Sequence, residues 1–92
     1  MRQVLLILKD VESRFANLEL ARDELKTLEY ASKYLKYLQR MRLWTRDAKF
    51  AWKGDQLRFL KSVSGFYSDY GAILKLLKRD QLRGKFKETA EE

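Results

Sequence analysis

The chain has 92 residues, 46% of them hydrophobic, and a formal net charge of +7. This length allows one small domain, and the apolar content is typical of a globular rather than a disordered chain. Histidine, cysteine and proline are all missing. The chain therefore lacks the usual general base near neutral pH, the thiolate ligands of metal sites, and the residue that most often interrupts helices.

The first 53 residues carry a helical repeat of apolar side chains. From Val4 onward, apolar positions recur in steps of four and three, and a step of three from Leu25 to Leu28 replaces an expected step of four. We expect a helix over residues 3–53 that either stays straight or bends near 26–29. A straight helix would be about 75 Å long at 1.5 Å per residue, so another chain would have to cover part of it.

A turn is predicted at Gly54 and Asp55, because glycine suits the left-handed residue after a helix and aspartate suits the N-cap of the next one. Beyond the turn, apolar residues continue at helical spacing through Gly65 and Gly71 without losing phase. The spacing predicts a second helix over residues 56–83.

Gly84 is the expected end of that helix, followed by a frayed acidic tail over residues 85–92. The predicted fold class is all-α. The chain forms either an antiparallel helical hairpin or a three-helix bundle, with coiled-coil-like packing, in a single domain over residues 1–92.

The segment from Val4 to Leu8 is apolar around the whole helix circumference, so one neighbouring helix cannot bury it. It either starts deep inside a bundle or docks a protein partner or a second copy of the chain. The candidate interface positions are Val4, Leu5, Leu8, Val11 and Phe15. The run is too short for a signal-peptide core or a membrane span, so we expect a cytoplasmic location.

Charge is distributed unevenly. Residues 1–30 have a net charge of −1, residues 31–87 of +11 and residues 88–92 of −3. So large an excess in the middle of the chain predicts an acidic partner, and nucleic acid is the first candidate because lysine and arginine contact phosphates. An acidic protein surface is the second, and a solvated helix face that binds nothing is the third.

A helical wheel centred on Met41 places seven of these cations in two columns, one on each side of the buried face. The first column consists of Arg42, Arg46, Lys49 and Lys53, and the second, which Asp47 dilutes, of Lys33, Lys36 and Arg40. The candidate nucleic-acid-binding residues are Lys36, Arg40, Arg42, Arg46, Lys49, Phe50, Lys53, Arg58, Lys61, Lys75, Lys78, Arg79 and Arg83. Phe50 lies nearly opposite the buried face, so we expect it to be either exposed or covered by a partner, and it is the best candidate for a functional, stacking aromatic residue. Tyr34, Trp44 and Trp52 are assigned to the core or its rim.

No catalytic motif is recognisable, and the acidic residues near the N-terminus alternate with basic ones, which is typical of ion pairs on a helix surface. We therefore expect a non-enzymatic protein with no cofactor, metal or small-molecule substrate. The leading hypothesis is a small basic accessory subunit that contacts the phosphate backbone of DNA or RNA. The alternative is a structural adaptor that binds a protein or homodimerises through its apolar N-terminal segment.

Overall fold

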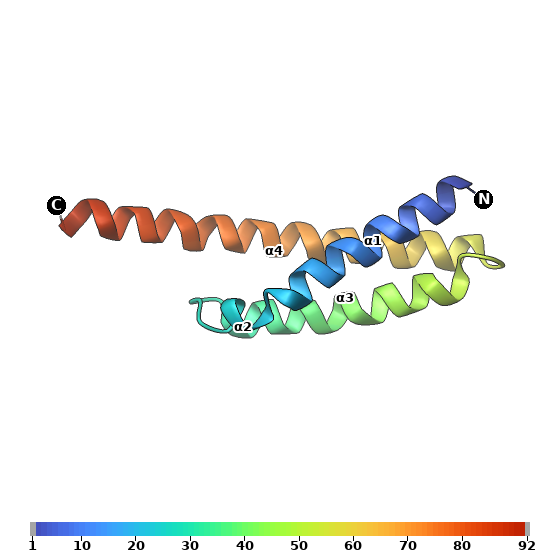
Figure 1. The fold of residues 1–92 in the computed structure, drawn as a ribbon, viewed down its shortest axis with the longest axis horizontal. Helices are drawn as coiled ribbons and strands as arrows, with labels where there is room; N and C mark the ends of the chain where they lie inside the picture. Colours follow the sequence, from blue (N-terminus) through green and yellow to red (C-terminus); the bar gives the residue numbers. More distant parts are fainter. Residues whose placement is uncertain (1, 92) are drawn as a thin grey trace.

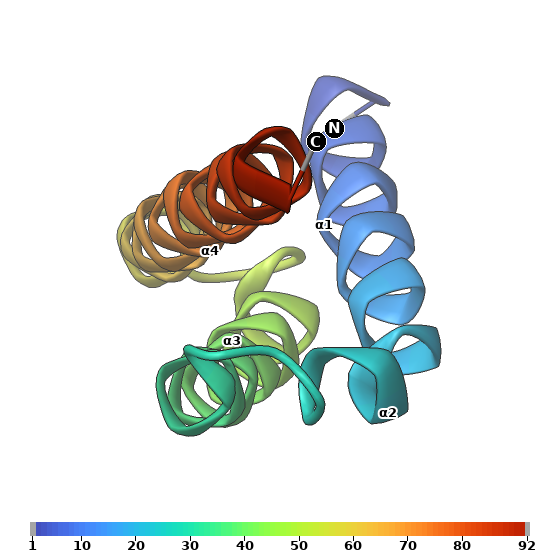
Figure 2. The same ribbon diagram turned by 90° about the vertical axis from the view of Figure 1, so that its left-hand side faces the viewer.

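The computed structural model describes the backbone of residues 2–91 and the side chains of residues 2–80. Within these residues there is no strand, and the chain forms α1 (Arg2–Leu20), α2 (Arg22–Leu25), α3 (Ala31–Ala51) and α4 (Gln56–Glu91). The three long helices lie at the corners of a triangle when the molecule is seen from its end (Figure 2). Helix α3 runs antiparallel to both α1 and α4 (Figure 1). The predicted all-α fold class is confirmed.

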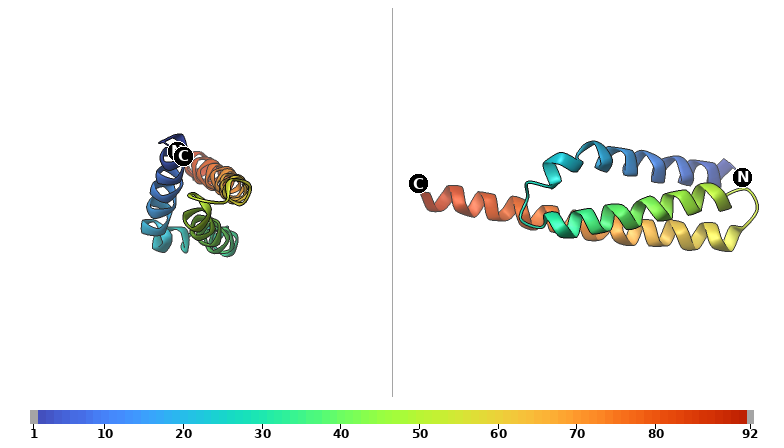
Figure 3. Two further views of the ribbon diagram at one scale, coloured as in Figure 1. Left: turned by 90° about the vertical axis from the view of Figure 1, so that its right-hand side faces the viewer. Right: turned by 90° about the horizontal axis from the view of Figure 1, so that it is seen from below.

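The first 53 residues form two long helices rather than one. The chain leaves α1 at Ala21, passes through the single turn of α2, and reverses over residues 26–30 (Figure 3). Short-range hydrogen bonds close the reversal, among them one from the Thr27 hydroxyl to the Glu24 carbonyl oxygen at 2.7 Å. The straight-helix alternative is therefore wrong. Folding back lets the apolar stripe of α1 cover α3 within one chain, with no second chain required.

The bundle is elongated because α4 is much longer than its neighbours. The molecule measures 57 × 21 × 19 Å, and its radius of gyration is 15.8 Å, against about 12 Å for a compact chain of this length. Helix α4 has 36 residues and extends past the ends of the other helices (Figures 1 and 3). Its length of about 54 Å, at 1.5 Å per residue, accounts for the long axis.

The sequence predicts that the last helix ends at Gly84, but the structure shows that it does not. Helix α4 continues to Glu91, so the predicted boundary at residue 83 is wrong. A glycine in a helix interior costs about 1 kcal/mol relative to alanine, which weakens a helix without terminating it. The side chains of the predicted acidic tail, residues 85–92, lie outside the described residues.

The core follows the predicted apolar stripes closely. The larger cluster of buried side chains joins all four helices and consists of Val11, Leu25, Tyr34, Leu38, Met41, Phe66, Ile73 and Leu76. A smaller cluster near the turn between α3 and α4 consists of Leu8, Ala48, Ala51 and Phe59. Trp44 and Trp52 are half-buried and pack on the rims of these two clusters, where the sequence analysis assigned them.

The turn between α3 and α4 is capped as predicted on one side only. The Asp55 carboxylate accepts a hydrogen bond from the Arg58 backbone N–H at 3.1 Å, which confirms the N-cap of α4. The left-handed conformation expected at Gly54 is wrong, since no described glycine has a positive φ. Helix α3 instead closes through right-handed turns, with Asp55 N–H donating to the Ala51 carbonyl oxygen at 2.9 Å.

Gly65 allows α3 and α4 to approach closely in the middle of the hairpin. A methyl group built on Gly65 would lie 2.7 Å from Cδ2 of the Trp44 side chain, well inside contact distance. The indole N–H of Trp44 donates to the Asp69 carboxylate at 3.0 Å, one turn further along α4. The absence of a side chain at Gly65 therefore leaves the space that the Trp44 ring occupies between α3 and α4.

Candidate nucleic-acid interface

The first predicted basic column lies on the side of α3 that faces α1. Arg42, Arg46 and Lys49 are exposed there. Together with Thr45, and with Glu12 and Phe15 from α1, they line a hollow of about 250 Å³. The column therefore forms one wall of a shallow groove between two helices.

One arginine of this column is already paired. Arg42 donates to the Glu19 carboxylate of α1 at 2.7 Å, and about half of the Arg42 side chain is exposed. An ion pair of this exposure is weak, and a phosphate can compete for the guanidinium. We therefore place Arg42 at the edge of the candidate surface rather than at its centre.

The second predicted column does not form a single surface. Arg40 turns toward α4, where its Nε lies 3.3 Å from the carboxylate of the buried Asp69. Lys36 lies instead on the α1 side, beside Glu19 and Arg22, along a second hollow of about 480 Å³. The two residues therefore have different surroundings, although the wheel places them in one column.

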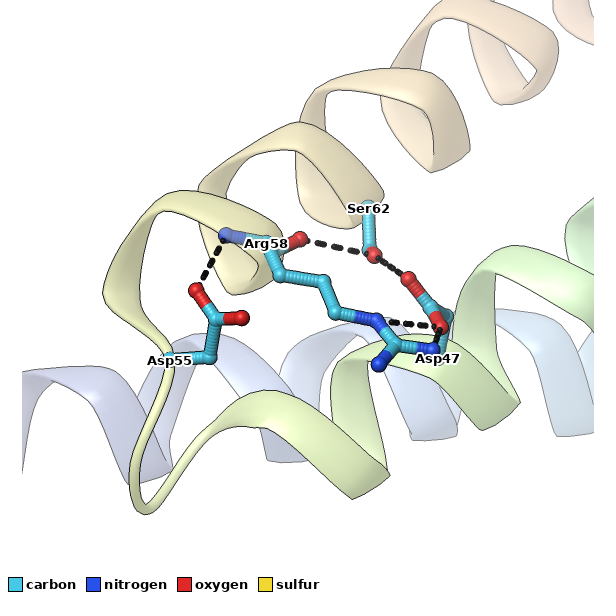
Figure 4. A network of polar contacts seen from close by, with 4 residues as sticks. All are labelled: Asp47, Asp55, Arg58 and Ser62. Carbon is cyan, nitrogen blue, oxygen red and sulfur yellow. Dashed lines mark hydrogen bonds and ion pairs between the residues drawn. The ribbon is translucent and has the colours of Figure 1, made fainter.

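Arg58, predicted to contact phosphate, is held inside a polar network between α3 and α4 (Figure 4). Its Nε donates to the Asp47 carboxylate at 2.9 Å, and the Ser62 hydroxyl lies 2.6 Å from the other oxygen of that carboxylate. Arg58 first, and then Ser62, lowers the pKa of Asp47 below its ordinary value. The network also includes Asp55, whose cap bonds the Arg58 backbone, so Arg58 has a structural role.

Several of the predicted cations are exposed and join no ion pair within residues 2–80. Four of them lie along the last turns of α3, the turn that follows and the first turns of α4: Arg46, Lys49, Lys53 and Lys61. Lys53 lies over the Trp52 ring, with its Nζ 5.1 Å from the ring centroid. We call these four residues the basic surface.

Phe50 is exposed as the sequence predicted, with 78% of its surface accessible. The guanidinium carbon of Arg58 lies 5.0 Å from the centroid of its ring. By helix geometry, Arg46 and Lys49 flank the ring on the α1 side, and Lys53 follows just beyond the end of α3. The aromatic ring therefore stands among the cations of the basic surface.

The remaining predicted cations lie further along α4. Lys75, Lys78 and Arg79 are exposed, and Lys75 is 14 residues, or about 21 Å, beyond Lys61 on the same helix. They form a separate patch and are not brought together with the basic surface. The side chain of Arg83 lies outside the described residues.

The predicted N-terminal interface is largely internal. Leu8 and Val11 are buried in the core, and Val4 and Phe15 pack against it. Leu5 is half-buried. The side chains that this segment exposes are Leu6, at 61% accessible, and Ile7, at 38%, neither of which the sequence analysis had selected.

A polar cluster that the sequence analysis missed joins α1 to α4. Arg14 donates to the Asp10 carboxylate at 2.9 Å and to the Tyr70 hydroxyl oxygen at 3.1 Å, and the Tyr67 hydroxyl also donates to Asp10. The bond from Tyr67, and after it the one from Arg14, lowers the pKa of Asp10. The spacing of Asp10 and Arg14, four residues apart on one helix, was the available signal for their pairing.

The described residues form neither a cluster of metal ligands nor a membrane-spanning helix. No three or more carboxylates gather closely enough among residues 2–80 to hold a metal ion. In the same part of the chain, no helix combines the length and apolar character needed to cross a membrane.

Comparison with protein-family models, with curated proteins and with solved structures gave no match to this chain.

Proposed function

We propose that this protein is a non-enzymatic, nucleic-acid-associated protein, a small basic accessory subunit that contacts the phosphate backbone through the basic surface. The observation that carries the proposal is how the acidic groups of the bundle are used. Asp10, Asp47, Asp69 and Asp80 each bind a partner across a helix interface. Four of the six aspartates are therefore occupied inside the fold, and Glu12 is an acid that lines the hollow beside Arg46 and Lys49.

The local charge balance supports the same proposal. Helix α3 holds six lysines and arginines against one aspartate, whereas α1 holds three against three acids. An exposed excess of this kind attracts a polyanion, because each contacted phosphate releases condensed counterions. With four cations on phosphates, the slope of log affinity against log salt is roughly −3 to −4 on duplex DNA.

The test is a salt titration of the full chain against labelled DNA and RNA. Arg46→Gln with Lys49→Gln removes two of the four contacts, so the salt slope becomes shallower by about 2 units. The matched control is Arg2→Gln with Lys9→Gln, which removes the same net charge from exposed positions on α1 and leaves the slope unchanged. The free energy of unfolding of both double variants stays within about 0.5 kcal/mol of the parent value.

Absence of binding to both nucleic acids at about 50 mM salt overturns the proposal, since electrostatic contacts are strongest there. Equal losses of nucleic-acid affinity in the two double variants also overturn it, because the net charge of the protein, rather than the basic surface, would then be responsible for binding. The alternative function, an adaptor or homodimer, draws support from the exposed Leu6 and Ile7 of the N-terminal segment. Light scattering on the same samples detects a stable homodimer directly.

A further inference from the structure

The surroundings of Phe50 separate it from the other exposed apolar side chains. Single exposed apolar residues are ordinary on protein surfaces, and Leu20 and Leu57 are as accessible as Phe50. Phe50 is an aromatic ring, however, and it stands within one helical turn of Arg46, Lys49 and Lys53. This combination of an exposed ring with cations beside it is typical of surfaces that stack nucleobases.

The ring is also supported from within the protein. Arg58 packs its guanidinium against Phe50, 5.0 Å from the ring centroid. That guanidinium is held by Asp47 through its Nε at 2.9 Å, and Asp47 is held in turn by Ser62 at 2.6 Å (Figure 4). Phe50 is therefore positioned by a fixed neighbour, while most of its surface remains accessible.

A second apolar side chain extends this surface along α3. Leu43 is 58% accessible and lies seven residues before Phe50, which places it two turns away on nearly the same face. Arg46 lies between them in the sequence. The outer face of α3 therefore presents two apolar contacts about 10 Å apart along the helix axis, with cations beside them.

We infer that this face of α3 binds single-stranded rather than duplex nucleic acid, with an unpaired base stacked on Phe50 and the flanking phosphates on Arg46, Lys49 and Lys53. The inference rests on the function proposed above and specifies its ligand. In a duplex, base faces are covered by the neighbouring base pairs, so an exposed ring has nothing to stack on. In a single strand every base offers a face, and stacking tolerates any sequence.

The experiment compares single-stranded and duplex oligonucleotides of the same sequence by fluorescence anisotropy. The parent chain binds the single strand more tightly. Phe50→Ala lowers the affinity for the single strand by about 5- to 150-fold, the range that loss of one base–aromatic stack produces. Its affinity for the duplex changes by less than about twofold, because the phosphate contacts remain.

Two further variants separate stacking from simple apolar contact. Phe50→Trp keeps a ring and retains single-strand affinity, whereas Phe50→Leu keeps apolar area without a ring and loses affinity as Phe50→Ala does. Leu57→Ala is the matched control, because Leu57 is equally exposed and is not aromatic. It leaves both affinities unchanged.

The outcomes distinguish this inference from the proposed function. If the parent binds duplex as tightly as single strand, or if Phe50→Leu binds like the parent, the inference fails while the phosphate contacts stand. If neither nucleic acid binds at low salt, the proposed function fails and takes the inference with it. A preference for single strands that disappears in Phe50→Ala and persists in Phe50→Trp supports both.

Discussion

The two flanks of α3 use the same kind of side chain for different purposes. On the flank toward α4, Arg40 meets the buried Asp69, and Arg58 reaches across from α4 to Asp47. On the flank toward α1, Arg42 pairs with Glu19, whereas Arg46 and Lys49 face solvent and join none of the ion pairs within residues 2–80. The position of an arginine relative to the acids of the next helix decides whether it stabilises the fold or remains available to a ligand.

Asp69→Ala, on the flank toward α4, is expected to lower the free energy of unfolding more than the other variants proposed below. It removes the acceptor for the Trp44 indole N–H and the partner of Arg40. Because hydrogen bonds to charged groups contribute about 1.5–3 kcal/mol, we expect unfolding in urea to become easier by about 2–3 kcal/mol. Nucleic-acid affinity is not reduced, since Arg40 is released rather than removed.

Ser68→Ala serves as the control for Asp69→Ala, since Ser68 immediately precedes Asp69 in α4 and is exposed. We expect its free energy of unfolding to change by no more than about 0.5 kcal/mol. An equally small change for Asp69→Ala would contradict the structural role assigned to the flank toward α4.

Gly65→Ala is expected to have the next largest effect, because it tests the close approach of α3 and α4. The added methyl group would overlap Trp44, and overpacking of this kind costs about 1–3 kcal/mol. Gly71→Ala is the control within the same helix, as a methyl group there meets nothing within 4 Å.

At position 71 the better helix propensity of alanine stabilises α4, by up to about 1 kcal/mol. Thermal unfolding of the two variants should therefore shift in opposite directions. A shift in the same direction for both would mean that Trp44 yields easily and that Gly65 is not required for the packing.

Asp47→Asn is expected to have the smallest effect, and it depends on pH. Arg58 lowers the pKa of Asp47 in the folded protein. The ionised Asp47 carboxylate therefore stabilises the folded state, and this stabilisation is complete above about pH 3.9, the ordinary carboxyl pKa. It is lost as the pH falls through the lowered pKa of the folded state. The variant should thus be less stable than the parent at neutral pH and equal to it in strong acid.

Melting temperatures of the parent and Asp47→Asn, measured from neutral to strongly acid pH, check this expectation. The effect is small because the pair is partly exposed, with 48% of the Arg58 side chain and 28% of the Asp47 side chain accessible. A difference that is constant across the pH range would show that packing, rather than the charge of Asp47, is responsible.

Local features of the fold were the most predictable from the sequence. The buried faces of the helices, the exposure of Phe50 and the Asp55 N-cap follow from periodicity and from side-chain chemistry within a few residues. The features that failed were the left-handed Gly54 and the helix end at Gly84. At both positions glycine can adopt the left-handed conformation that ends a helix, but it can equally stay right-handed. The sequence alone therefore does not decide which conformation is adopted.

The sequence by itself determined that the chain is helical, which side chains face inward, and that the excess of positive charge lies beyond residue 30. Only the tertiary structure decided that the first 53 residues fold back, that Trp44 packs on Gly65, and which cations are neutralised. The physical reason is one of range. Helical periodicity assigns each side chain an angle around its own helix, whereas an ion pair also requires the identity of the neighbouring helix at that angle, and residues far apart in the chain supply it.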